Sequence, residues 1–264
     1  EDEAYRGLFR DLRFRQAMSL AINRDEINEV NSYGMGTPSQ YIAFSPKPDF
    51  IDSKWSSHYA QYDPAQANAL LDQTGAVDTD GDGMRELPNG DPLVINIDFA
   101  TQGIGGGEVE LVARHWNDVG VKTLFKEVTP DEYRGAQSSN QLDVGAWQKN
   151  QPIAIILGEN ELFVPPYENY FGHTTAIKWA EYIDSNGSSG IKPPQYAYDL
   201  IDAVNTFQSA SAGSAESHAS GNKMVELLVE NLLFIGTVAA PYPVFVRNAL
   251  KNVTQFKVAS YNYY

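Results

Sequence analysis

Residues 62–99 hold a helix, an acidic loop and a strand in direct succession, and this order constrains the fold more than any other stretch of the chain. Asp63 and Pro64 predict a helix start, because aspartate accepts from free backbone N–H groups and proline at the first helical position loses no hydrogen bond. Gly75 predicts the helix end, since glycine tolerates a positive φ. Apolar residues alternate over residues 93–99, which is typical of a half-buried strand.

Helix and strand patterns keep alternating after this unit. We predict a helix over residues 108–119, a strand over 121–128, a short helix over 130–137 and a strand over 142–147. This alternation predicts an α/β fold with a mixed sheet and helices packed on it. The flanking parts are expected to supply helices over residues 12–31, 174–186, 195–211 and 215–231, and closing strands over residues 232–239 and 243–247.

Composition excludes several classes of protein. The formal net charge is −15 and the pI about 4.6, whereas a phosphate backbone requires a basic face, so we expect no nucleic-acid partner. The chain has no cysteine, which excludes thiol catalysis, a disulfide scaffold and a cysteine-based zinc site. No apolar run approaches the roughly 20 residues of a membrane-spanning helix, so the chain is not expected to span a membrane.

Four motifs, in this order, resemble those of one protein family. They are LRFRQAMSLAINRDEI at residues 12–27, YDP with DTDGDGMRE within residues 62–86, WNDVGV at residues 116–121 and LDVGAW at residues 142–147. Together they resemble family 5 of the extracellular solute-binding proteins, which capture ligands for ABC importers of peptides, nickel and some oligosaccharides. The resemblance covers most of the chain and implies a mixed-sheet α/β lobe of a two-lobe, periplasmic-binding-protein-like fold.

The resemblance also implies where the protein works and with what. The chain opens at the first helix of the family's second lobe, so we expect residues 1–264 to be a single C-terminal ligand-binding lobe without the N-terminal lobe. The implied location is extracytoplasmic, either periplasmic or lipid-anchored on the outer face of the cell membrane. The implied partners are a small-molecule ligand, the missing N-terminal lobe and an ABC permease.

The acidic loop carries carboxylates at alternate positions followed by glycines, an arrangement that suits a hard cation. The candidate ligands of a structural calcium ion are Asp78, Asp80, Asp82 and Glu86. The loop is not an EF-hand, because Asn89 stands where that motif has its bidentate glutamate. The alternative is an Asx-turn loop held by its own backbone hydrogen bonds. No other cofactor is predicted.

The end of the strand over residues 142–147 is the predicted ligand-binding place. By resemblance, Trp147 lines the cleft between the lobes, where an indole offers a sugar ring or an apolar side chain a flat face and one donor. A core tryptophan that caps the sheet is the alternative. Peptide-binding members carry an aspartate a few residues later for the peptide's amine, and Pro152 stands there instead. An unpaired ammonium in a closed cleft is costly. The sequence therefore favours an oligosaccharide. Its hydroxyls would form hydrogen bonds with Gln148, Lys149 and Asn150.

The favoured function is capture of an oligosaccharide or oligopeptide and its delivery to an ABC permease, without a reaction. A glycan-acting enzyme is one alternative, because Asp98 and Glu108 could form a glycosidase dyad. With 34 acidic residues, however, such pairs arise by chance. No GxSxG, HExxH or P-loop motif occurs. The other alternative is a stand-alone module that binds a protein.

Overall fold

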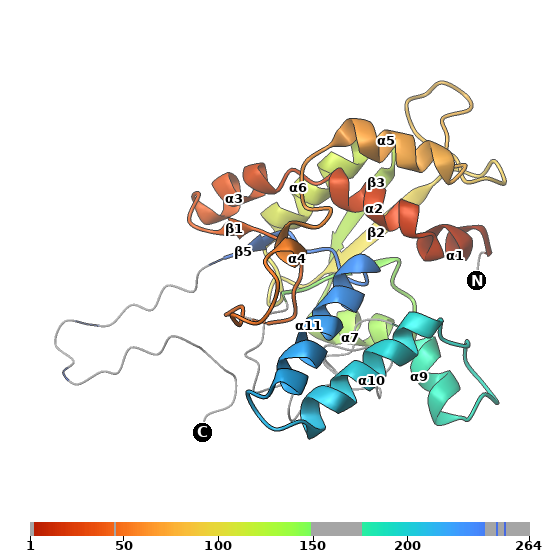
Figure 1. Cartoon of the computed structure of the whole chain (residues 1–264). Helices are drawn as coiled ribbons and strands as arrows, with labels where there is room; N and C mark the ends of the chain where they lie inside the picture. Colours follow the sequence, from red (N-terminus) through yellow and green to blue (C-terminus); the bar gives the residue numbers. More distant parts are fainter. Residues whose placement is uncertain (1–2, 45, 149–175, 241–246, 248–250, 252–264) are drawn as a thin grey trace.

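The computed structural model places helices around a small parallel sheet, with a pair of long helices beside it (Figure 1). The structure describes residues 3–44, 46–148, 176–240, 247 and 251. In these residues the helices are α1 (Glu3–Arg10), α2 (Leu12–Leu20), α3 (Arg24–Ser32), α4 (Lys54–Ser57), α5 (Pro64–Gln73), α6 (Gly106–Asn117), α7 (Pro130–Ser138), α9 (Ile177–Asp184), α10 (Gln195–Ser209) and α11 (Ala215–Glu230). The strands are β1 (Thr37–Pro38), β2 (Val94–Phe99), β3 (Lys122–Glu127), β4 (Val144–Ala146) and β5 (Val238–Ala239).

The central sheet has the order β3-β2-β4, and both of its pairings are parallel. Phe99 at the end of β2 lies level with Glu127 of β3 on one side and with Ala146 of β4 on the other. A separate antiparallel pair joins β1 to β5. The predicted α/β fold is thus confirmed, and its parallel and antiparallel pairings belong to two sheets within the described part of the chain.

One hydrophobic core lies between the central sheet and the helices α2, α5 and α6. Ile95, Ile97 and Phe99 point to the same face of β2 and are almost fully buried, as the alternation in the sequence predicts. The indole N–H of Trp116 on α6 donates to the carbonyl oxygen of Met18 on α2 at 2.9 Å. This bond satisfies the polar atom of a buried tryptophan and fixes the two helices together.

A second hydrophobic core lies between α10 and α11. The loop that precedes α4 packs into it through Phe44, and α4 itself through Trp55; both residues are buried. Phe50 of the same loop stacks on His218 of α11, with ring centroids 4.5 Å apart. The aromatic residues of this proline-rich loop therefore pack against the chain itself.

The start and end predicted for α5 are confirmed, and α7 begins with a cap of its own. Asp63 accepts from the backbone N–H of Gln66 at 2.9 Å and starts α5, and Gly75 adopts a φ of 82° just after that helix. Thr129 and Glu132 form a capping box at the start of α7, in which each side chain binds the other residue's backbone N–H.

The single helix predicted over residues 12–31 is wrong, because the structure divides it into α2 and α3. The side chain of Asn23 accepts from the backbone N–H of Glu26 at 3.1 Å and so starts a new helix. Residues 232–239 do not form one strand either. At Gly236 the backbone N–H donates to the side chain of Gln40 at 3.0 Å, and the carbonyl accepts from Arg24 at 2.9 Å, so side chains replace a strand ladder. Residues 243–246 of the other closing strand lie outside the described part.

Candidate functional site

The carboxyl ends of the three parallel strands meet at one edge of the central sheet, where ligands of open α/β sheets usually bind. Thr101 follows β2, Glu127 ends β3 and Trp147 follows β4. The hydroxyl of Thr101 donates to the Glu127 carboxylate, which connects two of the strand ends. We call this side of the sheet the carboxyl edge.

Trp147 lies half-buried at the carboxyl edge, and Gln148 beside it is exposed. The backbone N–H of Gln148 donates to the carbonyl oxygen of Gly103 at 2.9 Å, which ties the end of β4 to the turn after β2. The structure thus brings these two predicted ligand-binding residues together. The other two, Lys149 and Asn150, lie outside the described residues, as does Pro152.

Tyr133 of α7 is the nearest aromatic neighbour of Trp147 in the described part, with ring centroids 5.0 Å apart at 38°. It is only 2% exposed, and its hydroxyl has no hydrogen-bond partner among the described residues. Burial raises the pKa of this hydroxyl above its ordinary value. One turn further along α7, the side-chain nitrogen of Gln137 is also buried without a partner in that part of the chain. A buried polar atom without a partner is costly, so this part of the fold is not optimised for stability.

Tyr133 and Gln137 are not among the residues that the sequence predicts for the site. Their i, i+4 spacing on a short capped helix was the available signal, because it places both side chains on one helix face. A tyrosine and a glutamine at this spacing are equally compatible with an exposed face, so the sequence alone does not reveal their burial.

The acidic loop lies at the opposite, amino end of the sheet. One carboxylate oxygen from each of the four predicted ligands lies within 4.8 Å of the others: Asp78, Asp80, Asp82 and Glu86. The same carboxylates also close the loop on itself. Asp78 accepts from the N–H groups of Gly81 and Gly83 at 2.7 and 3.0 Å, Asp80 accepts from Asp82 at 3.0 Å, and Asp82 accepts from Met84 at 2.7 Å. The predicted Asx-turn geometry is therefore present.

Arg85 anchors this loop and was not singled out from the sequence. The residue is only 8% exposed. The guanidinium donates to the carbonyl oxygens of Val119 and Ala76 at 2.9 and 2.5 Å. It also donates to the side chains of Asp72 and Asn68 of α5, at 2.6 and 2.8 Å. Four acceptors from three parts of the chain therefore fix the loop to the fold.

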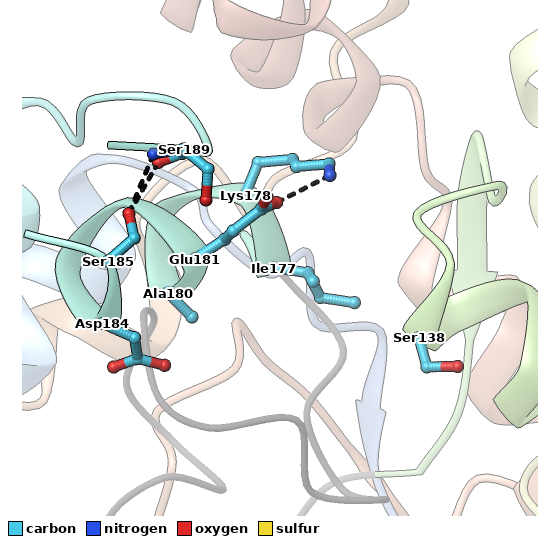
Figure 2. Close-up of a pocket in the computed structure, with 8 residues that line it drawn as sticks. All are labelled: Ser138, Ile177, Lys178, Ala180, Glu181, Asp184, Ser185 and Ser189. Atoms are coloured by element: carbon cyan, nitrogen blue, oxygen red, sulfur yellow. Dashed lines mark hydrogen bonds and ion pairs between the residues drawn. The ribbon is translucent and has the colours of Figure 1, made fainter. Parts of the chain in front are cut away.

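A cavity of about 510 Å³ lies between α9 and the end of α7 (Figure 2). The side chain of Ile177 points across it toward Ser138. Lys178 and Glu181 in its wall form an ion pair of 2.7 Å, and the hydroxyl of Ser185 donates to the carbonyl oxygen of Ser189 at 3.1 Å. Four of the lining groups are thus paired with one another within the wall of the cavity.

The fold and the motifs agree with a comparison to known families. Residues 3–153 match bacterial extracellular solute-binding proteins, family 5 middle region. The chain belongs to this family. The predicted resemblance is thus confirmed, and the extracellular description of the family agrees with the predicted extracytoplasmic location. Among the described residues, no helix has both the length and the apolar character to cross a membrane.

Relatives of this family 5 chain are named for sugars and for peptides. The periplasmic alpha-galactoside-binding protein of Rhizobium meliloti is 22% identical over 95% of this chain and 35% of its own length. The structure of an oligopeptide-binding protein, OppA, gives a TM-score of 0.79 at 31% identity, over 90% of this chain and 39% of OppA. A periplasmic binding protein from Agrobacterium fabrum, MelB in complex with stachyose, gives 0.72 at 22% identity, over 91% and 36%. All three are binding proteins by name, and this chain spans well under half the length of each.

Proposed function

We propose that the chain is the C-terminal ligand-binding lobe of a longer solute-binding protein, which captures an oligosaccharide or an oligopeptide and delivers it to an ABC permease. The observation that carries the proposal is the half-buried Trp147 at the carboxyl edge of a parallel sheet, in a chain of family 5. An aromatic face held at such an edge can stack on a sugar ring or an apolar side chain. The chain supplies one face of the cleft, and another lobe of the same protein supplies the other.

The proposed mechanism is lobe closure without a chemical reaction. A ligand that contacts both lobes favours the closed state by its differential affinity for that state. Trp147 and Gln148 would contribute an apolar face and an amide from this lobe. Lys149 and Asn150 are the further polar groups that the sequence places next along the chain.

An oligosaccharide is the ligand that we favour of the two. Pro152 replaces the aspartate that the resemblance expects for a peptide's amine, and amide side chains precede it. The names of the alpha-galactoside-binding relative and of the stachyose complex support a sugar, whereas the name of OppA supports a peptide. A sugar and a peptide should therefore be tested side by side in the same experiment.

The intact protein, with both lobes, should be titrated with stachyose and with tetra-alanine by calorimetry. We expect one of the two probes to bind, and uptake of that probe by cells to depend on the protein and on an ABC permease. Uptake that persists after deletion of the gene would contradict the transport role. Release of monosaccharides from stachyose would favour the enzyme alternative. Binding of a protein by the 264-residue chain alone would favour the interaction module.

The glycosidase alternative has little support from the two carboxylates on which it rests. Glu108 accepts from the hydroxyl of Thr237 just before β5, and burial raises its pKa above the ordinary value. Asp98 lies within β2, where it affects the pKa of Tyr133. The two carboxyls thus interact with different residues, Glu108 with Thr237 and Asp98 with Tyr133. We propose that the protein has no catalytic activity.

For the acidic loop we propose a structural calcium ion as a separate part of the function. Calcium takes oxygen ligands at about 2.3–2.6 Å, so ligand atoms on one ion lie within roughly 5 Å of one another. The four carboxylate oxygens satisfy this condition. Asp80 and Asp82 each use a single oxygen in the Asx turns, which leaves the second oxygen for an ion.

A further inference from the structure

We infer that Gly103 is a positioning residue for ligand recognition, because its missing side chain provides the place in which the Trp147 indole lies. The inference rests on the proposed function, in which that indole faces the ligand. Gly103 would not touch the ligand itself. It would determine how far the ring stands out from the carboxyl edge and at what tilt.

The contact between Gly103 and the ring is closer than any side chain allows. A Cβ atom at residue 103 would lie 2.3 Å from Cδ2 of Trp147, 2.4 Å from Cε3 and 2.6 Å from Cε2. These atoms belong to the fused part of the indole, which cannot bend away from a clash. Any residue other than glycine would therefore displace the whole ring.

The turn that carries Gly103 is fixed from both sides. The N–H groups of Gly103 and Ile104 donate to the carbonyl oxygen of Ala100 at 2.7 and 3.1 Å. The carbonyl oxygen of Gly103 accepts from the N–H of Gln148, the residue after the tryptophan, at 2.9 Å. Because the turn is bonded to β2 and to the end of β4, it cannot retreat to accommodate a methyl group at residue 103.

A second glycine provides space for the other ring of this pair. A Cβ atom at Gly145 of β4 would lie 2.5 Å from the hydroxyl oxygen of Tyr133. Tyr133 in turn contacts the Trp147 ring. Gly103 and Tyr133 therefore restrict the positions open to the indole, and a ring that is already ordered loses little conformational entropy on binding.

Gly105 is a matched control in the same loop. A Cβ atom there would have no heavy atom within 4 Å. Its φ is −72°, which any residue adopts, and Gly103 is not among the residues with a positive φ. An alanine at either position therefore restricts the unfolded chain in a similar way. Gly105 is also the N-cap of α6, where alanine is disfavoured, so Gly105→Ala is expected to lower stability, whereas of the two variants only Gly103→Ala displaces the ring.

The experiment compares Gly103→Ala with Gly105→Ala in the intact protein, by calorimetry with stachyose and tetra-alanine. We expect Gly103→Ala to lower the affinity for the bound probe by at least tenfold. Gly105→Ala should lower that affinity by less than twofold. In a Trp147→Ala background, Gly103→Ala should have no further effect, because the ring that it displaces is gone. Wild-type affinity in Gly103→Ala, or an equal loss in the Trp147→Ala background, would overturn the inference.

A second measurement separates this inference from the proposed function. The 264-residue chain has four tryptophans, so its NMR spectrum contains few indole N–H signals. The signal that is lost in Trp147→Phe is the one from Trp147. We expect Gly103→Ala to shift that signal and Gly105→Ala to leave it in place. If neither probe binds to the wild type but the signal shifts, the binding role fails for these ligands while the positioning of the ring stands. An unshifted signal would overturn the positioning itself.

Discussion

The two ends of the central sheet differ in how well their buried polar groups are satisfied. At the amino end, the Arg85 guanidinium is buried and reaches four acceptors. On α7, the polar atoms of Tyr133, which contacts Trp147 at the carboxyl edge, and of Gln137 one turn further on are buried without a partner among the described residues. Native structures pair most buried polar atoms, and exceptions call for an explanation. The Arg85 contacts stabilise the amino end, and we propose that the carboxyl edge is the binding face.

The residue types alone would suggest that the acidic loop, rather than the carboxyl edge, is the binding site. The acidic loop looks like a site in the sequence, yet its carboxylates bind their own backbone and a buried arginine holds its base. At the carboxyl edge the described residues include the aromatic pair Trp147 and Tyr133, and the Tyr133 hydroxyl has no partner in that part of the chain. The predictions below separate stability at one end from binding at the other.

Arg85→Ala should have the largest effect, on stability alone. The substitution leaves the carbonyl oxygens of Val119 and Ala76 without their donor, and we expect a loss of about 3 kcal/mol in the free energy of unfolding. Urea denaturation measures this loss. Arg13→Ala is the control, because Arg13 pairs with Asp11 at the surface and should matter little. A loss of ligand affinity in folded Arg85→Ala would contradict the assignment of stability to the amino end and of binding to the carboxyl edge.

Trp147→Ala should have the next largest effect, on binding. We expect the affinity of the intact protein to fall by more than tenfold, about 1.4 kcal/mol, with little change in the midpoint of thermal unfolding. Trp116→Phe is the control, since it removes the bond to Met18 in the core and should lower stability while affinity is kept. Unchanged affinity in Trp147→Ala would support the alternative, in which Trp147 is a core tryptophan that caps the sheet.

Tyr133→Phe should have a smaller and opposite effect. It removes a buried hydroxyl that has no partner in the described part of the chain, so we expect a gain of about 1 kcal/mol in stability. Urea unfolding of the variant beside the wild type gives the difference. A clear loss of stability would mean that the hydroxyl is satisfied, and the contrast between the two ends would weaken.

Calcium should have the smallest effect, a rise of a few degrees in the melting temperature by mass action on the native state. Asp80→Ala should abolish the rise, whereas Asp49→Ala, which changes an exposed carboxylate outside the loop, should preserve it. Thermal unfolding with calcium or with a chelator measures both. An identical melting temperature in the two conditions would leave the Asx turns as the whole explanation of the loop.

The sequence predicted those parts of the fold that local chemistry determines. The start of α5 at Asp63, its end at Gly75 and the alternation along β2 each depend on a few neighbouring residues. The break at Asn23 was also local: an asparagine followed three residues later by Glu26 is a cap signal, which the longer apolar pattern concealed.

The candidate site was predictable only in part. Trp147 and Gln148 stand at a strand end, which motif and spacing predict. Gly103 and Tyr133 reach the tryptophan from a turn and a helix more than ten residues away, so their roles depend on tertiary packing. Arg85 is similar, because its acceptors come from residues 68, 72, 76 and 119.

The most direct test of the two-lobe account compares the affinity of the intact protein with that of the 264-residue chain alone. Each is titrated calorimetrically with whichever of stachyose and tetra-alanine the intact protein binds. A ligand between two lobes loses the contacts of one whole face in the isolated lobe, so we expect at least a hundredfold weaker binding, about 2.7 kcal/mol. Equally tight binding by the lobe alone would contradict the account.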